Sequence, residues 1–247
     1  MSKTVLVNVR AFAAGVDLTS QSNKIELSSE VEDKETTNYG SNGWKESIGG
    51  LGSAELSGEG QWEAGDPGKV DDASWAHLGT VIPWSVSANN DASVGSLAYL
   101  MSALRSNYTL GGTVGDVAPW TGTGKSSSPL VRGQFAHPPG LARTATGTGT
   151  GLQVGAVPTG RRMHAALHVL SVAGTATPTI TARIESSVDN TFAAPTTRLT
   201  FTAASAVGGQ ILRTSGSAIT DTWWRIAWTI SGTTPSFLFV GSLGIGA

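Results

Sequence analysis

The sequence predicts a mainly β protein, an antiparallel β-sandwich or barrel with one flanking α-helix and a second β-rich half. Residues 53–64 (SAELSGEGQWEA) alternate polar and apolar side chains over twelve positions, which is the period of a strand with one solvated face. Glycine contributes 32 of 247 residues and charged residues only 14%, a composition that favours strands and turns. Closely spaced strand-like segments fill residues 162–245, as in antiparallel sandwiches and barrels.

The N-terminal part, residues 1–120, is expected to combine strands with the main helix. That helix is expected over about 93–106, because Leu97, Leu100, Met101 and Leu104 follow the i, i+3, i+4, i+7 spacing of a helical stripe. A shorter helix is expected within 66–79, ending at Gly79. Residues 33–52 are polar and glycine-rich, and they predict an extended loop. The expected strands are 3–9, 24–32, 53–64 and 81–87.

The rest of the chain divides into a connection and a C-terminal β part. Residues 121–155 are rich in Gly, Pro and Thr and are expected to form a linker or a set of loops. Residues 156–247 are expected to form a sandwich-like part, either separate or completing one shared domain with the first. The expected strands there are 162–172, 178–187, 197–203, 209–214, 222–231 and 236–245.

The charge is small overall but unevenly placed. The net charge is −2, which excludes a global basic field for nucleic acid. Residues 1–80 carry six Lys/Arg and thirteen Asp/Glu, a net of −7, whereas residues 81–247 carry ten and five, a net of +5. Unlike surfaces on one chain favour self-association. The absence of cysteine excludes disulfides and thiol chemistry, and no segment reaches the roughly 20 apolar residues of a membrane helix.

The glutamates could suggest a glycosidase, but their spacing favours a solvated strand face. Glu55 and Glu59 would lie roughly 13 Å apart on a strand at about 3.3 Å per residue, whereas glycosidase carboxyls lie within about 5–9.5 Å of each other. On the opposite side of the strand, Gly58 and Gly60 are expected where another group packs closely against the backbone. The candidate acidic face consists of Glu26, Glu30, Glu32, Glu55, Glu59 and Glu63.

Other motifs give no cofactor, metal or catalytic site. His164 and His168 in HAALH have helical zinc-ligand spacing, but the segment is strand-like and lacks the adjacent glutamate. TGTGKSS at 121–127 lacks the first glycine of a phosphate loop, and no G-x-S-x-G nucleophile motif occurs. We therefore expect no enzyme activity.

Two tryptophans, Trp44 and Trp120, fall in segments expected to be loops, where they could stack on sugars or pack against another subunit. Trp223 and Trp224 are adjacent on an expected strand, so one of them is expected to lie outside the core. These residues keep open a second hypothesis, a carbohydrate- or receptor-binding β-sandwich module.

The N-terminal pattern resembles the major tail, or tail tube, proteins of long-tailed bacteriophages. The resemblance lies in residues 23–66, with NYGSNGWKE, then GGL, then an alternating strand ending in GQWEAGD, and it extends to GDVAPW. The closing TWWRIAWTISGTTPSFLFVGSLGI is similar to C-terminal stretches of such proteins.

The resemblance implies a structural virion protein, made in the bacterial host cytoplasm, that acts in the tail and not at a membrane. Its partners would be itself, in sixfold or pseudo-sixfold rings stacked into a tube, and other tail proteins. DNA would pass through the lumen along the acidic face without specific binding. The rings would be hexamers, or trimers if each chain holds two tube-like halves. The candidate inter-subunit loop contains Tyr39, Trp44, Lys45 and Glu46.

Overall fold

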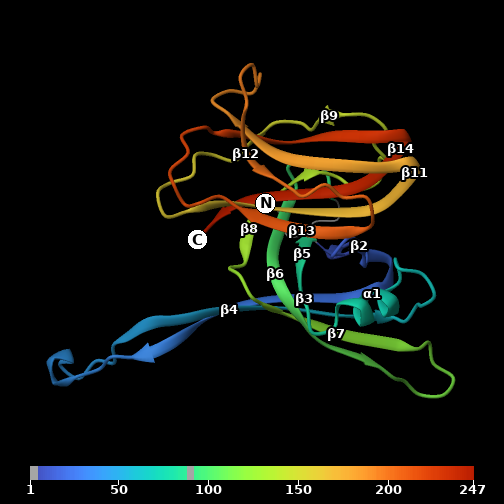
Figure 1. Ribbon diagram of the computed structural model, residues 1–247. Helices are drawn as coiled ribbons and strands as arrows, with labels where there is room; N and C mark the ends of the chain where they lie inside the picture. The colour runs from blue at the N-terminus through green and yellow to red at the C-terminus, as the bar shows by residue number, and fades with distance from the viewer. Residues whose placement is uncertain (1–4, 88–91) are drawn as a thin grey trace.

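The computed structural model describes residues 5–87 and 92–247, as two layers connected by one hydrogen-bonded network of strands (Figure 1). All strand pairs between described residues are antiparallel, which confirms a mainly β fold with one α-helix. No helix in the described part is long and apolar enough to cross a membrane. The elements are β1 (Arg10–Ala13), β2 (Val16–Asp17), η1 (Thr19–Gln21), β3 (Ser22–Glu35), η2 (Tyr39–Ser41), β4 (Ser47–Gln61), α1 (Val70–His77), β5 (Val81–Ser87), β6 (Leu97–Leu110), β7 (Pro119–Ser126), β8 (Val131–His137), β9 (Gly147–Thr148), β10 (Leu152–Gln153), β11 (Arg162–Ser187), β12 (Thr196–Thr200), β13 (Gly208–Arg213) and β14 (Trp223–Gly246).

The lower layer is a four-stranded sheet in the order β3-β4-β7-β6, which we call the platform. β6 continues past the platform and pairs with β5 and β8, which connect it to the upper layer. Residues 3 and 4 of the strand expected over 3–9 lie outside the described residues, and the first strand observed begins at Arg10.

β3 and β4 extend beyond the platform as a projecting two-stranded hairpin (Figure 1). β7 pairs only with residues 55–61 of β4, and Ala54 pairs with Ser29, so residues 29–54, which we call the arm, are held by the β3–β4 ladder. The loop expected over 33–52 is therefore wrong in extent, because only residues 36–46 connect the strands. A register shift between Val31 and Asp33 lets the ladder continue through the glycine-rich segment.

The helix expected over 93–106 is wrong, because residues from Leu97 onward form the strand β6 and residues 93–96 form a turn. Ala98, Leu100, Met101 and Ala103 are all buried. A strand that is covered on both faces has no polar–apolar alternation, so its apolar run also fits a helical stripe. The α-helix is α1, and the short helix expected within 66–79 is confirmed.

The expected connection over 121–155 contains most of β7 and all of β8. β7 alternates Thr121, Thr123 and Lys125 with buried Trp120, Gly122 and Gly124, and it fills the gap between β4 and β6. Glycine is needed at positions 122 and 124 because the side chains of Arg105 and Trp84 lie directly against them. The division into residues 1–120 and 156–247 stays a prediction.

The upper layer is a sandwich built from one long ribbon. β11 and β14 pair along nearly their whole length, from Arg162 opposite Gly246 to Ser187 opposite Trp223. The ladder is irregular near Gly174 and Gly232, which both have positive φ, and there the ribbon turns back over itself (Figure 1). Both halves of the ribbon contribute side chains to one core.

Candidate assembly surface

The register of the platform places a continuous row of polar side chains on one face. Lys24 lies opposite Glu59, and Glu59 lies opposite Thr121 on β7. In the next rows Glu26 faces Ser57 and then Thr123, and Ser28 faces Glu55 and then Lys125. Directly paired residues point to the same side of a sheet. This surface, which we call the polar face, is the exposed side of the platform.

The polar face carries both signs of charge. Lys24 forms an ion pair with Glu26 at 3.5 Å, and Lys34 contacts Glu32. Lys125 lies in register with Glu55. Each lysine is therefore next to a carboxylate, while the carboxylates remain in excess. Sequence reasoning missed Lys125, Thr121 and Thr123, although their alternation over 120–125 is a strand signal.

The opposite face of the platform packs against aromatic side chains. Trp120 is buried, and its Nε1 donates a hydrogen bond to the Gln21 carbonyl at 2.8 Å. The expectation that Trp120 lies in a loop and is available for stacking is therefore wrong. A Cβ at Gly58 would lie 3.0 Å from the Trp120 ring, and one at Gly60 would lie 1.9 Å from the Gln21 carbonyl oxygen. The predicted close packing against both glycines is confirmed.

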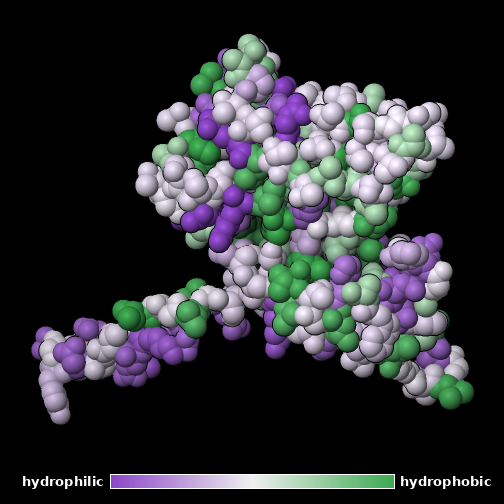
Figure 2. All heavy atoms as spheres, viewed as in Figure 1, coloured by the Kyte–Doolittle hydropathy of each residue, from purple (hydrophilic) through white to green (hydrophobic). Residues whose placement is uncertain are grey.

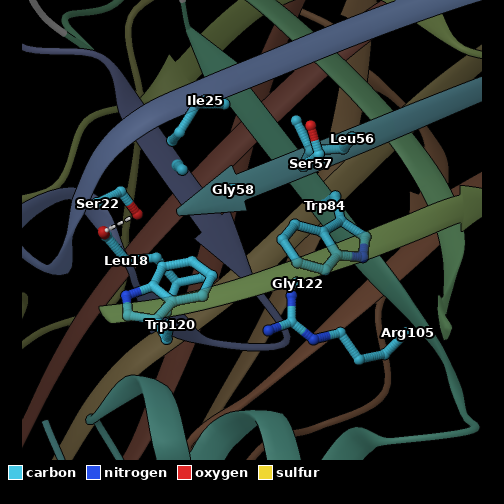
Figure 3. Close-up of a pocket in the computed structure, with 11 residues that line it drawn as sticks. Leu18, Ser22, Ile25, Leu56, Ser57, Gly58, Trp84, Arg105, Trp120 and Gly122 are labelled. Atoms are coloured by element: carbon cyan, nitrogen blue, oxygen red, sulfur yellow. Dashed lines mark hydrogen bonds between the residues drawn. The ribbon is translucent and has the colours of Figure 1, made fainter. Parts of the chain in front are cut away.

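A buried arginine, Arg105, lies close to the rings of Trp84 and Trp120 (Figure 3). Arg105 is 3% exposed, and its guanidinium carbon lies 5.5–5.9 Å from the ring centroids of Trp84, Tyr108 and Trp120. Nη2 donates to the Ser74 hydroxyl at 2.6 Å. Burial lowers the pKa of Arg105 to about 10. Cation–π contact partly replaces the water that burial removes from the guanidinium. Because the guanidinium also binds Ser74 of α1, Arg105 joins α1 to the platform.

The outer strands of the platform leave hydrogen-bonding edges open. Within the described residues β3 pairs only with β4, so its other edge is free along Ser22–Glu35. At the other side of the sheet, β6 pairs with β7 alone from Asn107 to Leu110. Unpaired edges are the places where a sheet of another chain can add.

The structure brings some predicted site residues together and separates others. Glu26, Glu55 and Glu59 lie on the polar face by register, and Glu30 and Glu32 follow them along β3 onto the arm. Glu63 lies beyond the end of β4, where its carboxylate binds Lys69, so its placement on the strand face is wrong.

The predicted loop residues lie at the tip of the arm. Tyr39 is fully exposed and Trp44 is 79% exposed, while Lys45 forms an ion pair with Glu35 at 3.4 Å. Glu46 closes the tip, because its carbonyl accepts a hydrogen bond from the Thr36 N–H at 2.9 Å. The tip therefore has a defined conformation that presents two aromatic side chains to solvent.

The histidine motif lies inside the fold. His168 is buried, and its Nε2 is 3.0 Å from the Ser85 hydroxyl, while His164 Nε2 is 3.0 Å from the Ala247 oxygen. The described residues contain no group of three His, Cys, Asp or Glu side chains placed to hold a metal. Trp224 is fully buried and Trp223 partly exposed, as expected for neighbours on a strand.

No family model and no curated protein matches the chain. Among solved structures, a native gene transfer agent virion has a similar chain at 19% identity and TM-score 0.40, covering 50% of this chain and 93% of that one. A chain of the anti-feeding prophage baseplate matches at 14% identity and TM-score 0.41, covering 53% and 97%. The Dit protein of phage SPP1 matches at 12% identity and TM-score 0.37, covering 97% and 99%. Likeness at these TM-scores carries no weight for function.

Proposed function

We propose that this chain is a structural subunit of a phage tail that closes into rings, which stack to form the tail tube. The observation that carries the proposal is the platform: one face packed, one face polar, and free edges on β3 and β6. Edge-to-edge joining would pair both free edges and place the polar face toward a water-filled lumen. The resemblance of residues 23–66 to tail tube proteins agrees with this assembly.

A ring of six chains is the favoured symmetry. Each chain supplies one open four-stranded platform, because the C-terminal half closes into a sandwich around its own core. Six platforms would give a wall of about 24 strands, more than the 16–18 that leave an aqueous channel in porins. A trimer would need a second open platform in each chain. The sandwich would then cover the outside of the wall and meet other tail proteins.

The polar face suits passage of DNA without retention. Tight DNA binding comes from lysines and arginines that neutralise phosphates, and Lys24 and Lys34 are already paired with Glu26 and Glu32. The excess carboxylates, including Glu59, repel the DNA backbone. DNA is therefore proposed to slide through the lumen with little attachment.

The arm is proposed to contact a neighbouring ring. A two-stranded hairpin is at best marginally stable alone in water, and this one projects from the body (Figure 1). Figure 2 shows hydrophobic side chains along the side of the arm that faces the body and hydrophilic ones along the other side. On the arm, Val31, Ile48 and Leu51 are exposed in the isolated chain. A neighbouring subunit would cover these side chains, with Tyr39 and Trp44 at the tip.

Electron microscopy and sedimentation of the purified chain over increasing concentration test the proposal. Sixfold rings or tubes with a central channel are expected. A chain that stays monomeric at every concentration would refute ring assembly. The exposed large apolar side chains of the described sandwich, Leu141, Val188 and Val207, are all aliphatic, so the sugar-binding alternative would rest on Tyr39 and Trp44 at the tip of the arm.

A further inference from the structure

A groove runs along the corner between the arm and the sandwich. One cleft of about 550 Å³ is lined by Val31, Ala54 and Leu130, with Glu30 at its rim. A second cleft of about 280 Å³ is lined by Arg213 together with serines. The two clefts share Ser127 and Ser128, so they form one concave surface, which we call the corner groove.

The end of the corner groove at the sandwich is basic. Arg213 is exposed, and Arg161 and Arg162 lie at the start of the strand whose His164 pairs with Arg213. None of these three arginines forms an ion pair with any carboxylate in the described part of the chain. Arg162 donates a hydrogen bond to the Thr214 carbonyl at 3.0 Å, which does not neutralise its charge. Arginines without a counter-charge are available for carboxylates and aromatic rings of a partner.

The segment around α1 has the complementary chemistry. Residues 63–72 contain four Asp/Glu and one Lys, a net charge of −3, and Lys69 is bound to Glu63. Among the described residues, the hydrogen-bond donors to the Asp71 and Asp72 carboxylates are all neutral, and they include the Trp62 indole and the Gly65 amide. Next to them Trp75 is 63% exposed. Aromatic side chains of this kind act as anchors in interfaces.

The two surfaces lie at opposite ends of the molecule along the platform strands. Figure 1 shows the arm, together with the C-terminal end of β14 beside Arg162, at one end, and α1 with the β6–β7 hairpin at the other. A copy placed behind another in the same orientation would bring its α1 end into the corner groove of the first. Such a head-to-tail contact does not close on itself and repeats along an axis.

We propose that the corner groove binds the α1 end of a second copy of this chain, and that this contact stacks the rings. This rests on the proposed tube function and specifies its axial interface. Trp75 would pack on Val31 and Leu130, and the acidic segment would meet Arg161, Arg162 and Arg213. The acidic α1 end and the basic end of the corner groove thus face each other at every repeat along the tube.

Reciprocal charge changes at two exposed positions test the contact. Arg213→Glu puts a negative charge in the corner groove, and Ala76→Arg puts a positive charge beside Trp75. Each alone creates like-charge repulsion and is expected to raise the concentration needed for tubes on the order of tenfold, whereas the double variant restores assembly. Val188→Glu, at an exposed position on the sandwich, is the control and should assemble like the unmodified chain.

The outcomes separate the two proposals. Tubes that form equally well with either single change, or a double variant no better than the singles, overturn the stacking contact but leave ring formation intact. If the unmodified chain forms single rings that never stack, the stacking contact is also overturned and ring formation is again left intact. A chain that forms no assembly at all overturns the tube function and the contact together. Circular dichroism of each variant shows that the fold is retained.

Discussion

Substitution of Gly60 by alanine gives a direct test of how the platform is built. Gly60 lies on β4 between Ser22 of β3 and Trp120 of β7, in register with both. An ideal Cβ at this position would lie 1.9 Å from the Gln21 carbonyl oxygen and 2.8 Å from the Ser22 Cα. Both neighbours are backbone atoms, so no side chain can rotate away.

The size of the effect follows from the geometry. Ordinary contacts begin at 3.4 Å, so the strands would have to separate by about 1.5 Å at a point where β4 is held on both sides. Overpacking in a core costs about 1–3 kcal/mol and occasionally more, and we expect the upper end, about 3 kcal/mol, because backbone must move. For a chain of this size that corresponds to a fall in Tm of roughly 6–12 °C.

Thermal unfolding followed by circular dichroism, with urea unfolding as a second measurement, checks this value. Gly111→Ala is the matched control, because a Cβ there would meet nothing within 4 Å. We expect that control to change the free energy of unfolding by less than about 0.5 kcal/mol. If Gly60→Ala and Gly111→Ala unfold at the same temperature, the close approach of η1 to β4 is incorrect.

Three further predictions address charge and assembly. Burial lowers the pKa of His168 to about 3 and that of His137 to about 4, so below the unfolded value near 6.5 the unfolded chain binds more protons. The free energy of unfolding therefore keeps its full value above about pH 6.5 and falls with decreasing pH by up to about 1.4 kcal/mol per pH unit for each histidine. Urea unfolding of a His168→Gln variant should show a shallower fall of this free energy with pH. Glu59→Lys should make assembled tubes retain duplex DNA, with a steeper salt dependence in a binding assay; unchanged binding would argue against a lumenal position. Val31→Asp should reduce tube formation in electron micrographs while leaving monomer Tm nearly unchanged, whereas Val207→Asp on the sandwich should affect neither.

The strands with one solvated face could be predicted from the sequence, and those covered on both faces could not. β3 and β4 alternate clearly because one side meets water, and both expected strands are found, although they extend into the expected loop and β4 already ends at Gln61. β6 is covered on both sides over Leu97–Ala103, so its apolar residues follow no period of two and were assigned to a helix. β7 was missed because Gly122 and Gly124 hide the apolar half of its alternation.

The candidate site shows the same limit. The polar face could be predicted from β3 and β4 alone, but its continuation to Lys125 depends on pairing between segments about 70 residues apart. The charge balance of the face depends on that pairing, since Lys125 lies in register with Glu55. Likewise, the sequence around Arg105 does not identify it as a buried cation, because apart from Tyr108 on the same strand its partners come from β5, β7 and α1.

The glycines of the platform connect its packed face to its polar face. Gly58 and Gly122 lie directly opposite each other on β4 and β7, and a Cβ at Gly122 would lie 2.5 Å from the Arg105 guanidinium. Because neither glycine has a side chain, they leave a shallow slot in which Trp120 packs against Gly58 and Arg105 packs against Gly122. Because α1 is fastened to the sheet through Arg105 and Ser74, the slot also fixes where the acidic α1 end stands relative to the edges of the platform. A side chain larger than glycine at position 122 would displace Arg105, and with it the surface that we propose for stacking, while leaving the polar face itself unchanged.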